Sequence, residues 1–194
     1  PPATIQERMY GYDASAEKIA MIQIAQQTFS TIVAFGTRDK YFLKVELIGH
    51  HVITATVMAI GLQPFAHAYI GIFFGLTELS TLPLNVIDTL KQFKNVAKAF
   101  PLVTMVCNFT FGIAFLVLRV GLTSYVSVGF QRDCYQLYST TGAAHSVPAV
   151  VFSSMANLFI CALQLYWARL IINGLVSTLT GSKKGKKGKN SKAA

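Results

Sequence analysis

Long apolar stretches alternate with short polar segments along the chain. A helix needs about 20 predominantly apolar residues to cross the hydrocarbon core of a bilayer. Five stretches meet or approach this length: 16–36, 41–62, 65–87, 101–126 and 147–172. The pattern therefore predicts an all-α fold, a multi-pass transmembrane helical bundle of about five spans.

The boundaries of this bundle follow from where the apolar pattern begins and stops. We expect an N-terminal segment 1–15, a transmembrane domain 16–180, and a disordered Lys-rich tail 181–194. Gln63-Pro64 between the second and third stretches indicates a tight turn, so these two helices should be antiparallel neighbours. His67 and His145 fall near span ends, where an interfacial position is expected.

Basic residues are distributed unevenly between the predicted loops. One side carries Arg38, Lys40, Lys91, Lys94, Lys98 and the tail lysines, whereas the other has Arg8, Lys18 and Arg132. Loops rich in Lys and Arg remain on the cytoplasmic side of a membrane. We expect the N-terminus on the lumenal or outer side and the C-terminus in the cytosol, matrix or stroma.

Composition agrees with a membrane protein and excludes several other classes. The chain is 53% hydrophobic and 13% charged, whereas soluble domains carry about 25% charged residues. The net charge of +9 comes mostly from the loops and tail, so it indicates topology rather than nucleic-acid binding. No GxSxG, HExxH, phosphate-binding glycine loop or CxxC is present, and we expect no metal site and no cofactor.

Ionisable groups inside the apolar stretches are the candidate chemistry. Glu46, His50 and Thr54 repeat every four residues and share one helical face, while His51 points about 100° away. One interpretation is a cavity in which a histidine takes a proton from a hydroxyl or amine. The other is a hydrogen-bonded polar core that holds the helices together.

Further polar residues extend this candidate site to the later spans. We expect His50 or His51 to approach Glu78 or Ser80, because the second and third helices share their depth. Arg119 lies deep in the fourth span, where it either reaches the interface or pairs with a carboxylate. Catalytic candidates are His50, His51 and Glu78; the expected lipid- or cavity-lining residues are Glu46, His50, His51, Thr54, Thr77, Glu78, Ser80, Asn85, Asn157 and Gln164.

Four segments together resemble the TLC domain family. They are the segment 7–18, the pair His50-His51, the segment 77–85 and the segment 163–167. The family includes ceramide synthases and translocon-associated proteins, and the resemblance implies helices arranged around a lipid-holding cavity. In ceramide synthases the histidine pair is followed by a His-Asp-x-x-Asp cluster, where this chain has Leu76-Thr-Glu-Leu-Ser80. The resemblance is therefore closer to the branch without synthase activity.

The resemblance also bears on the number of spans, on partners and on location. The family core usually has six spans, so a sixth would precede Pro1. The endoplasmic reticulum is expected by resemblance, or a mitochondrial or plastid membrane if the N-terminus is processed. Expected partners are membrane lipids, other integral membrane subunits, and an anionic leaflet or acidic partner for Lys183–Lys192. Bound lipids are expected, and a pigment only within a photosynthetic complex.

Three functional hypotheses follow from these observations. The first is a non-catalytic protein that binds or regulates membrane lipids through a polar intramembrane cavity. The second is an accessory subunit of a larger respiratory or photosynthetic supercomplex. The third is an acyl-CoA-dependent lipid acyltransferase that uses His50 and His51, although the missing aspartates argue against efficient catalysis.

Overall fold

The computed structural model describes residues 4–38 and 43–179, apart from the side chains of Lys94, Thr178 and Leu179, and these residues form helices without any strand. The predicted tail lies outside the described residues. The elements in chain order are α1 (Ile5–Tyr10), α2 (Ala14–Thr37), α3 (Val45–Ile60), α4 (His67–Ile70), η1 (Gly71–Gly75), η2 (Leu76–Ser80), α5 (Thr81–Gln92), α6 (Lys94–Ala99), α7 (Pro101–Ala114), η3 (Phe115–Leu122), α8 (Thr123–Ser139) and α9 (Val147–Leu179).

Several of these elements join into longer helices that suit a bilayer. Four helices are long and apolar enough to span it, namely 14–37, 67–92, 101–139 and 147–177, and α3 is a shorter apolar helix. The predicted multi-pass helical membrane bundle is confirmed. The 16 residues of α3 extend about 24 Å, which is less than the roughly 30 Å hydrocarbon core.

The fourth helix is longer than the sequence pattern predicted. We expected it to end near residue 126, where polar residues begin, but it continues without a break to Ser139. The polar side chains of α8 have hydrogen-bond partners on other helices. The helix can therefore continue past residue 126 without leaving these polar groups unpaired. Gln131 donates to the Ser154 carbonyl (3.0 Å) and to Asn157 Oδ1 (2.9 Å) of α9, and Asp133 pairs with Arg8 of α1.

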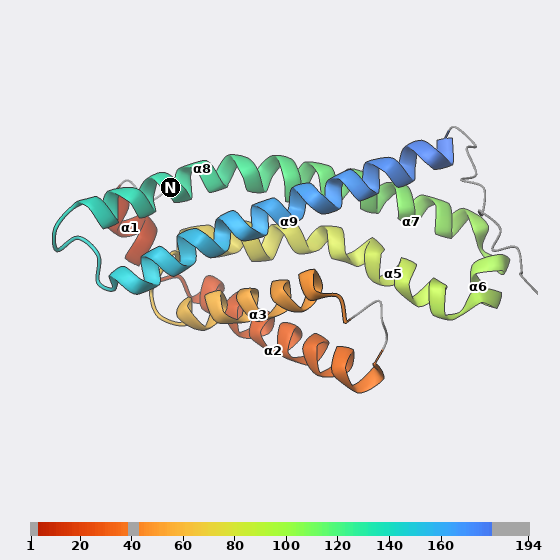
Figure 1. Cartoon of the computed structure of the whole chain (residues 1–194), viewed down its shortest axis with the longest axis horizontal. Helices are drawn as coiled ribbons and strands as arrows, with labels where there is room; N and C mark the ends of the chain where they lie inside the picture. Colours follow the sequence, from red (N-terminus) through yellow and green to blue (C-terminus); the bar gives the residue numbers. More distant parts are fainter. Residues whose placement is uncertain (1–3, 39–42, 180–194) are drawn as a thin grey trace, which may run out of the picture.

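The helices run roughly parallel to the long axis of the molecule (Figure 1). The continuous helix 101–139 packs along α9, and α5 packs against α7. At the end that holds α1, the α2–α3 hairpin is joined to the rest, because α2 contacts α4 and η1, and α3 contacts α9. Towards the opposite end α2 runs away from the helix 67–92 (Figure 1).

A set of paired polar groups closes the α1 end. Thr4 and Glu7 form a reciprocal capping box that starts α1, which brings Arg8 to Asp133 on α8. The guanidinium donates to both carboxylate oxygens at 2.6 and 2.7 Å, and Tyr69 donates to the same carboxylate at 2.5 Å. Asp133 is 3% exposed and Met9 beside it is fully buried. The hydrogen bond to Asp133 raises the pKa of Arg8 above its usual value.

The two histidines expected at the interfaces differ. His67 is buried, with 2% exposure, because its ring hydrogen-bonds to backbone groups of the turn between α3 and α4 and to the residue before α2. Its Nδ1 accepts from the Asp13 amide (3.0 Å), and its Nε2 donates to the carbonyls of Gly61 and Gln63 (2.9 Å each). His145 is exposed and stacks on Tyr10 at 3.8 Å. His67 does begin the span 67–92, as the sequence indicated, but the sequence does not reveal that its ring is buried in a turn.

Two of the long helices are distorted at the depth of the candidate residues. The third changes from α to a π-turn in η1 and then to a 3₁₀ turn in η2, and the fourth contains the π-helical η3. Such segments are frequent at functional sites. A side chain at Gly75 would lie 3.2 Å from Ile19 of α2, so this glycine permits close approach of the two helices.

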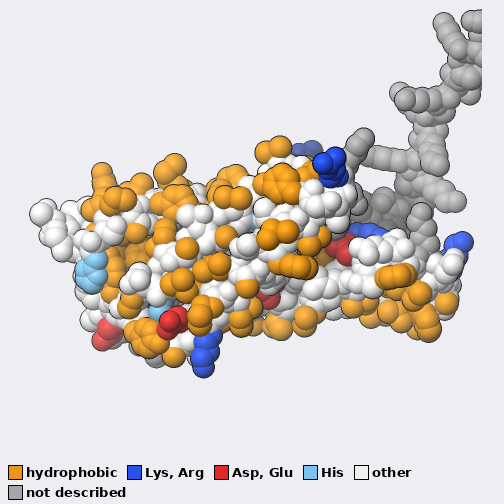
Figure 2. Space-filling model, turned by 90° about the horizontal axis from the view of Figure 1, so that it is seen from below, with side chains coloured by type: hydrophobic (Ala, Val, Ile, Leu, Met, Phe, Trp, Pro, Cys, Tyr) orange, Lys and Arg blue, Asp and Glu red, His pale blue; other side chains and the backbone are white. Residues whose placement is uncertain are grey.

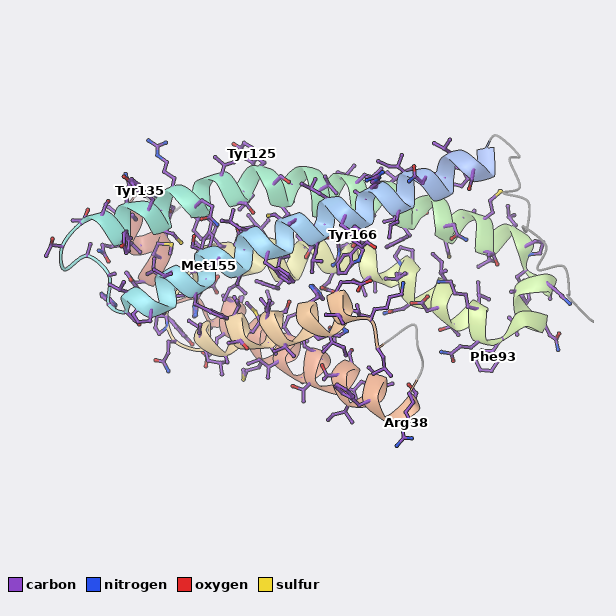
Figure 3. All side chains as sticks on the ribbon, viewed as in Figure 1. Arg38, Phe93, Tyr125, Tyr135, Met155 and Tyr166 are labelled. Atoms are coloured by element: carbon purple, nitrogen blue, oxygen red, sulfur yellow. The ribbon has the colours of Figure 1, made fainter. Side chains whose placement is uncertain are left out.

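The outer surface is apolar along the length of the bundle. Figure 2 shows hydrophobic side chains spread over one face, with few charged ones among them. Tyr125 and Tyr135 on α8 are 81% and 70% exposed. Arg38 and Phe93 lie at the end of the molecule away from α1 (Figure 3). A surface of this kind suits a lipid environment and not water.

Candidate functional site

A cavity of about 430 Å³ is lined by residues of α2, α3, η2, α5, α7, η3 and α9. We call it the outer cavity. Both predicted histidines lie in its lining. Its charged lining residues are Lys44, Glu46, Glu78, Lys91 and Arg119. Three cations and two carboxylates thus line a cavity in a bundle whose outer surface is largely apolar.

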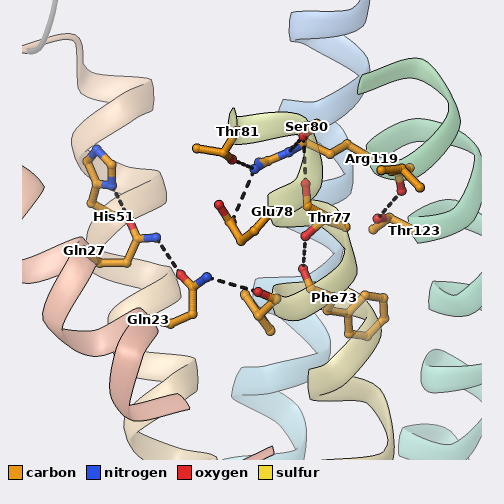
Figure 4. Close-up of polar contacts among 12 residues, drawn as sticks. Gln23, Gln27, His51, Phe73, Thr77, Glu78, Ser80, Thr81, Arg119 and Thr123 are labelled. Carbon is orange, nitrogen blue, oxygen red and sulfur yellow. Dashed lines mark hydrogen bonds and ion pairs between the residues drawn. The ribbon is translucent and has the colours of Figure 1, made fainter. Parts of the chain in front are cut away.

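Arg119 organises one wall of the outer cavity (Figure 4). Its Nε donates to Ser80 Oγ at 2.7 Å, its Nη2 donates to Thr81 Oγ1 at 2.7 Å, and the same nitrogen lies 3.3 Å from Glu78 Oε1. Of the two alternatives for Arg119, pairing with a carboxylate is therefore what the structure shows. A charge at this depth is tolerated when it is paired and hydrogen-bonded. Within the described residues its other terminal nitrogen, Nη1, has no partner.

The turn that carries these acceptors is shaped by its own hydroxyl groups. Thr77 Oγ1 donates to the Phe73 carbonyl at 2.6 Å, and Ser80 Oγ donates to the Thr77 carbonyl at 2.7 Å. Both residues are buried. Ser80 thus donates to the backbone and accepts from Arg119, which holds η2 in the geometry that the guanidinium requires.

His51 is held by a chain of side-chain amides on α2 (Figure 4). Its Nδ1 contacts Gln27 Oε1, Gln27 Nε2 donates to Gln23 Oε1 at 3.0 Å, and Gln23 Nε2 donates to the Phe74 carbonyl at 3.1 Å. Gln23 and Gln27 are 2% and 5% exposed. These two glutamines of α2 therefore face other helices and not the outer surface.

The order of donors in this chain fixes the proton on His51. A carbonyl only accepts, so Gln23 must present its nitrogen to Phe74 and its oxygen to Gln27. Gln27 must then present its oxygen to His51, and Nδ1 carries the proton. In the neutral ring the Nε2 lone pair is therefore available to accept a hydrogen bond from a ligand.

His50 occupies the junction between the outer cavity and a second, smaller one. Its ring meets Trp167 of α9 edge-on at 5.4 Å and lies 5.6 Å from the His51 ring. It lines both cavities, as do Gln27, Glu78 and Arg119. Its Nδ1 is buried without a hydrogen-bond partner among the described residues.

The expected direct contact between the histidine pair and the third span is not found among the described residues. His51 pairs with Gln27 of α2, and Glu78 is engaged by Arg119. The physical reason is that η1 and η2 are not α-helical, so Glu78 is rotated towards the fourth helix. The histidines and Glu78 nevertheless share the outer cavity.

The second cavity, about 70 Å³ in volume, lies between α2, α3, α4–η1 and α9. We call it the inner chamber. Aromatic rings of Phe65, Tyr69, Phe73, Phe74 and Phe130 form much of its wall. Its polar lining residues include Thr54, Thr77, Asn157 and Gln164, all of which the sequence had suggested.

Two suggested residues behave differently from the rest. Asn157 lines the inner chamber and also links helices, because its amide nitrogen donates to Ser127 Oγ at 3.1 Å and its oxygen accepts from Gln131. Asn85 is exposed and lines neither cavity. The lining side of α5 follows Leu84, Ile87 and Lys91, and Asn85 falls one position off this row.

Sequence reasoning missed the Arg8–Asp133–Tyr69 cluster. One signal was available, because Asp133 is the only acidic residue after Asp88 in the whole chain. A single carboxylate in a region this apolar requires a partner. The sequence does not reveal that the partner is 125 positions away.

The comparison with protein families gives one match. A family model described as the TLC domain (TRAM_LAG1_CLN8) matches residues 3–173. No curated protein and no solved structure matches the chain.

Proposed function

The chain belongs to the TLC domain family, and from this membership and the outer cavity we propose that it is a non-catalytic protein that binds or regulates membrane lipids. The observation that carries the proposal is the outer cavity itself. It places a partly unpaired guanidinium and an accepting imidazole in a bundle whose outer surface is apolar. Such a cavity suits a molecule with one polar and one apolar end.

The size and lining of the outer cavity suit a lipid headgroup. Its volume of about 430 Å³ lies within the roughly 300–1,000 Å³ of small-molecule sites. Leu47 of α3 and Leu84 of α5 add apolar surface near the charged groups, as do Phe111 and Ile171. Headgroup oxygens would accept from Arg119, and the first carbons of the chains would contact these apolar side chains.

We place the route of entry between the α2–α3 hairpin and α5, whose residues line the outer cavity. Because residues of α3 and α5 form facing walls of the outer cavity, a lipid would enter sideways from the bilayer. The basic residues Arg38, Lys91 and Lys98 belong to the end away from α1. By the positive-inside rule, the mouth would face the cytosol, matrix or stroma, in the endoplasmic reticulum or an organelle membrane.

The hydrogen-bond partners favour binding over acyl transfer. A general base is strengthened when a carboxylate orients the imidazole and stabilises its protonated form. His51 is oriented by the neutral amide of Gln27, and Glu78 is engaged by Arg119. The site therefore supplies hydrogen-bond partners for a ligand without a carboxylate–imidazole pair, which agrees with the non-synthase branch of the family.

Native mass spectrometry after gentle detergent extraction tests this proposal. We expect the chain to retain bound lipid, and Leu47→Trp with Leu84→Trp to reduce retention strongly by filling the outer cavity. Leu82→Trp is the matched control, since Leu82 is on the same helix as Leu84 but is 63% exposed.

Equal lipid retention by the cavity-filling and control variants would contradict the proposal. Migration only in fixed stoichiometry with unrelated membrane subunits, without bound lipid, would favour the accessory-subunit hypothesis instead.

A further inference from the structure

Four residues that line the inner chamber each have a buried polar atom without a partner among the described residues. The atoms are His50 Nδ1 and Thr54 Oγ1 on α3, and Ser153 Oγ and Gln164 Oε1 on α9; none has a hydrogen-bond partner within the described part of the chain. Thr54, Ser153 and Gln164 are 2%, 3% and 5% exposed. All four residues line the same chamber.

This concentration is specific to the chamber. Neighbouring polar side chains on the same two helices are paired: Thr56 Oγ1 donates to the Val52 carbonyl at 2.8 Å, and Ser154 Oγ donates to Gln131 Oε1 at 2.6 Å. Buried polar groups in native proteins are normally satisfied by protein, water or ligand. The four atoms therefore mark a place where a further group completes the hydrogen bonding.

We propose that the inner chamber binds adjacent hydroxyl groups of a polyol, carried by a lipid headgroup. This rests on the proposed function, in which a lipid occupies the outer cavity. The unpartnered atoms select the chemistry, because the hydroxyls of Thr54 and Ser153 both donate and accept, while Gln164 Oε1 only accepts. A ligand must then donate as well as accept, which hydroxyl groups do and which phosphate oxygens or a quaternary ammonium do not.

Charge and space agree with a neutral, hydroxylated group. Arg119, the cation in the chamber lining, is already shared among Glu78, Ser80 and Thr81. The volume of about 70 Å³ is several times the roughly 10–15 Å³ that one water requires. His50, Glu78 and Arg119 line both cavities, so a headgroup anchored in the outer cavity can extend into the chamber.

A pair of lipids that differ only in these hydroxyls tests the proposal. Phosphatidylglycerol and phosphatidylpropanol carry the same charge, phosphate and three-carbon headgroup, but only the first has a terminal diol. We expect the purified full chain to bind phosphatidylglycerol about tenfold more tightly, as two or more hydrogen bonds would give. The combined variant Thr54→Val, Ser153→Ala should lose this preference while still binding both lipids.

Thr56→Val is the matched control and should keep the full preference, since its hydroxyl is exposed and already bonded to the backbone. Free glycerol at millimolar concentration should not displace phosphatidylglycerol. Displacement would mean that the chamber serves a free polyol, and would overturn the assignment to a lipid.

The remaining outcomes separate this inference from the proposed function. Equal binding of both lipids by the wild-type chain would mean that water alone fills the chamber; the inference would then fail while lipid binding stands. Binding of neither lipid nor of phosphatidylcholine would overturn both. The wild-type comparison does not depend on the folding of any variant.

Discussion

The end of the molecule that holds α1 and the region of the two cavities handle buried polar groups in opposite ways. At the α1 end, both oxygens of Asp133 and both ring nitrogens of His67 are engaged. In the cavity region, His50, Thr54, Ser153 and Gln164 each leave a buried atom without a partner among the described residues. Full pairing favours a single stable arrangement, whereas unpaired groups cost stability unless a ligand completes them. We propose that the first region serves the fold and the second serves binding.

The largest effect is expected at the α1 end. Asp133→Asn should lower the free energy of unfolding by about 2–4 kcal/mol, because an amide cannot accept from Arg8 and Tyr69 as a carboxylate does. Thermal unfolding in detergent measures it. Asp88→Asn is the control, since its ion pair with Lys91 is largely exposed and should change stability by about 0.5 kcal/mol or less. Equal stability changes in the two variants would contradict the claim that paired buried groups stabilise the α1 end.

A smaller loss is expected from the amide chain beside the outer cavity. Gln27→Leu leaves His51 Nδ1 and Gln23 Oε1 without their partner, at a cost of about 1–3 kcal/mol. Gln26→Leu is the neighbouring control, because Gln26 is exposed. Chemical denaturation of both variants measures the difference, and an unchanged stability of Gln27→Leu would mean that the amide chain does not hold His51.

Removing a hydroxyl of the inner chamber should raise the free energy of unfolding and not lower it. Thr54→Val removes a buried hydroxyl that has no partner, so the lipid-free protein should gain about 0.5–1 kcal/mol of stability. Adding the preferred lipid should reverse this order, since only the wild-type chain gains the hydrogen bond. A loss of stability in Thr54→Val without lipid would show that the hydroxyl is already satisfied, for example by bound water.

The smallest effect of changing the histidines is expected on acyl transfer, because we expect no measurable turnover in the first place. With a long-chain base and acyl-CoA, we expect the purified chain to give no turnover above a membrane blank, and His50→Ala or His51→Ala to change bound lipid instead. Losing one member of a proton-transfer pair typically costs 10²- to 10⁴-fold in rate. Turnover that disappears in His50→Ala would promote the acyltransferase hypothesis to first place.

Hydrophobic length was enough to predict the bundle, because each span must satisfy its backbone internally whatever its neighbours are. The same reasoning placed His50, His51 and Glu78 at one depth, and they do share the outer cavity. The depth of a residue in the membrane can be predicted from the sequence, because it depends only on the distance along the helix from the end of the span.

The direction in which each side chain points around its helix could not be predicted from the sequence. Each π-turn adds a residue to a turn, which rotates all that follows by about 100°. The departures from α-helical geometry in η1 and η2 set the direction of the Glu78 side chain, which meets Arg119 and not His50. Pairing across long separations, such as Arg8 with Asp133, is set by tertiary packing and leaves no periodic signal.

Crosslinking with a phospholipid that carries a photoreactive group near its headgroup tests the central claim most directly. In native membranes we predict adducts on Leu47 and Leu84, which line the outer cavity from α3 and α5, and their suppression by unlabelled lipid. Val52 and Leu82 on the exposed faces of the same helices should react weakly and without saturation. Adducts confined to Val52 and Leu82, with none in the outer cavity, would contradict the account.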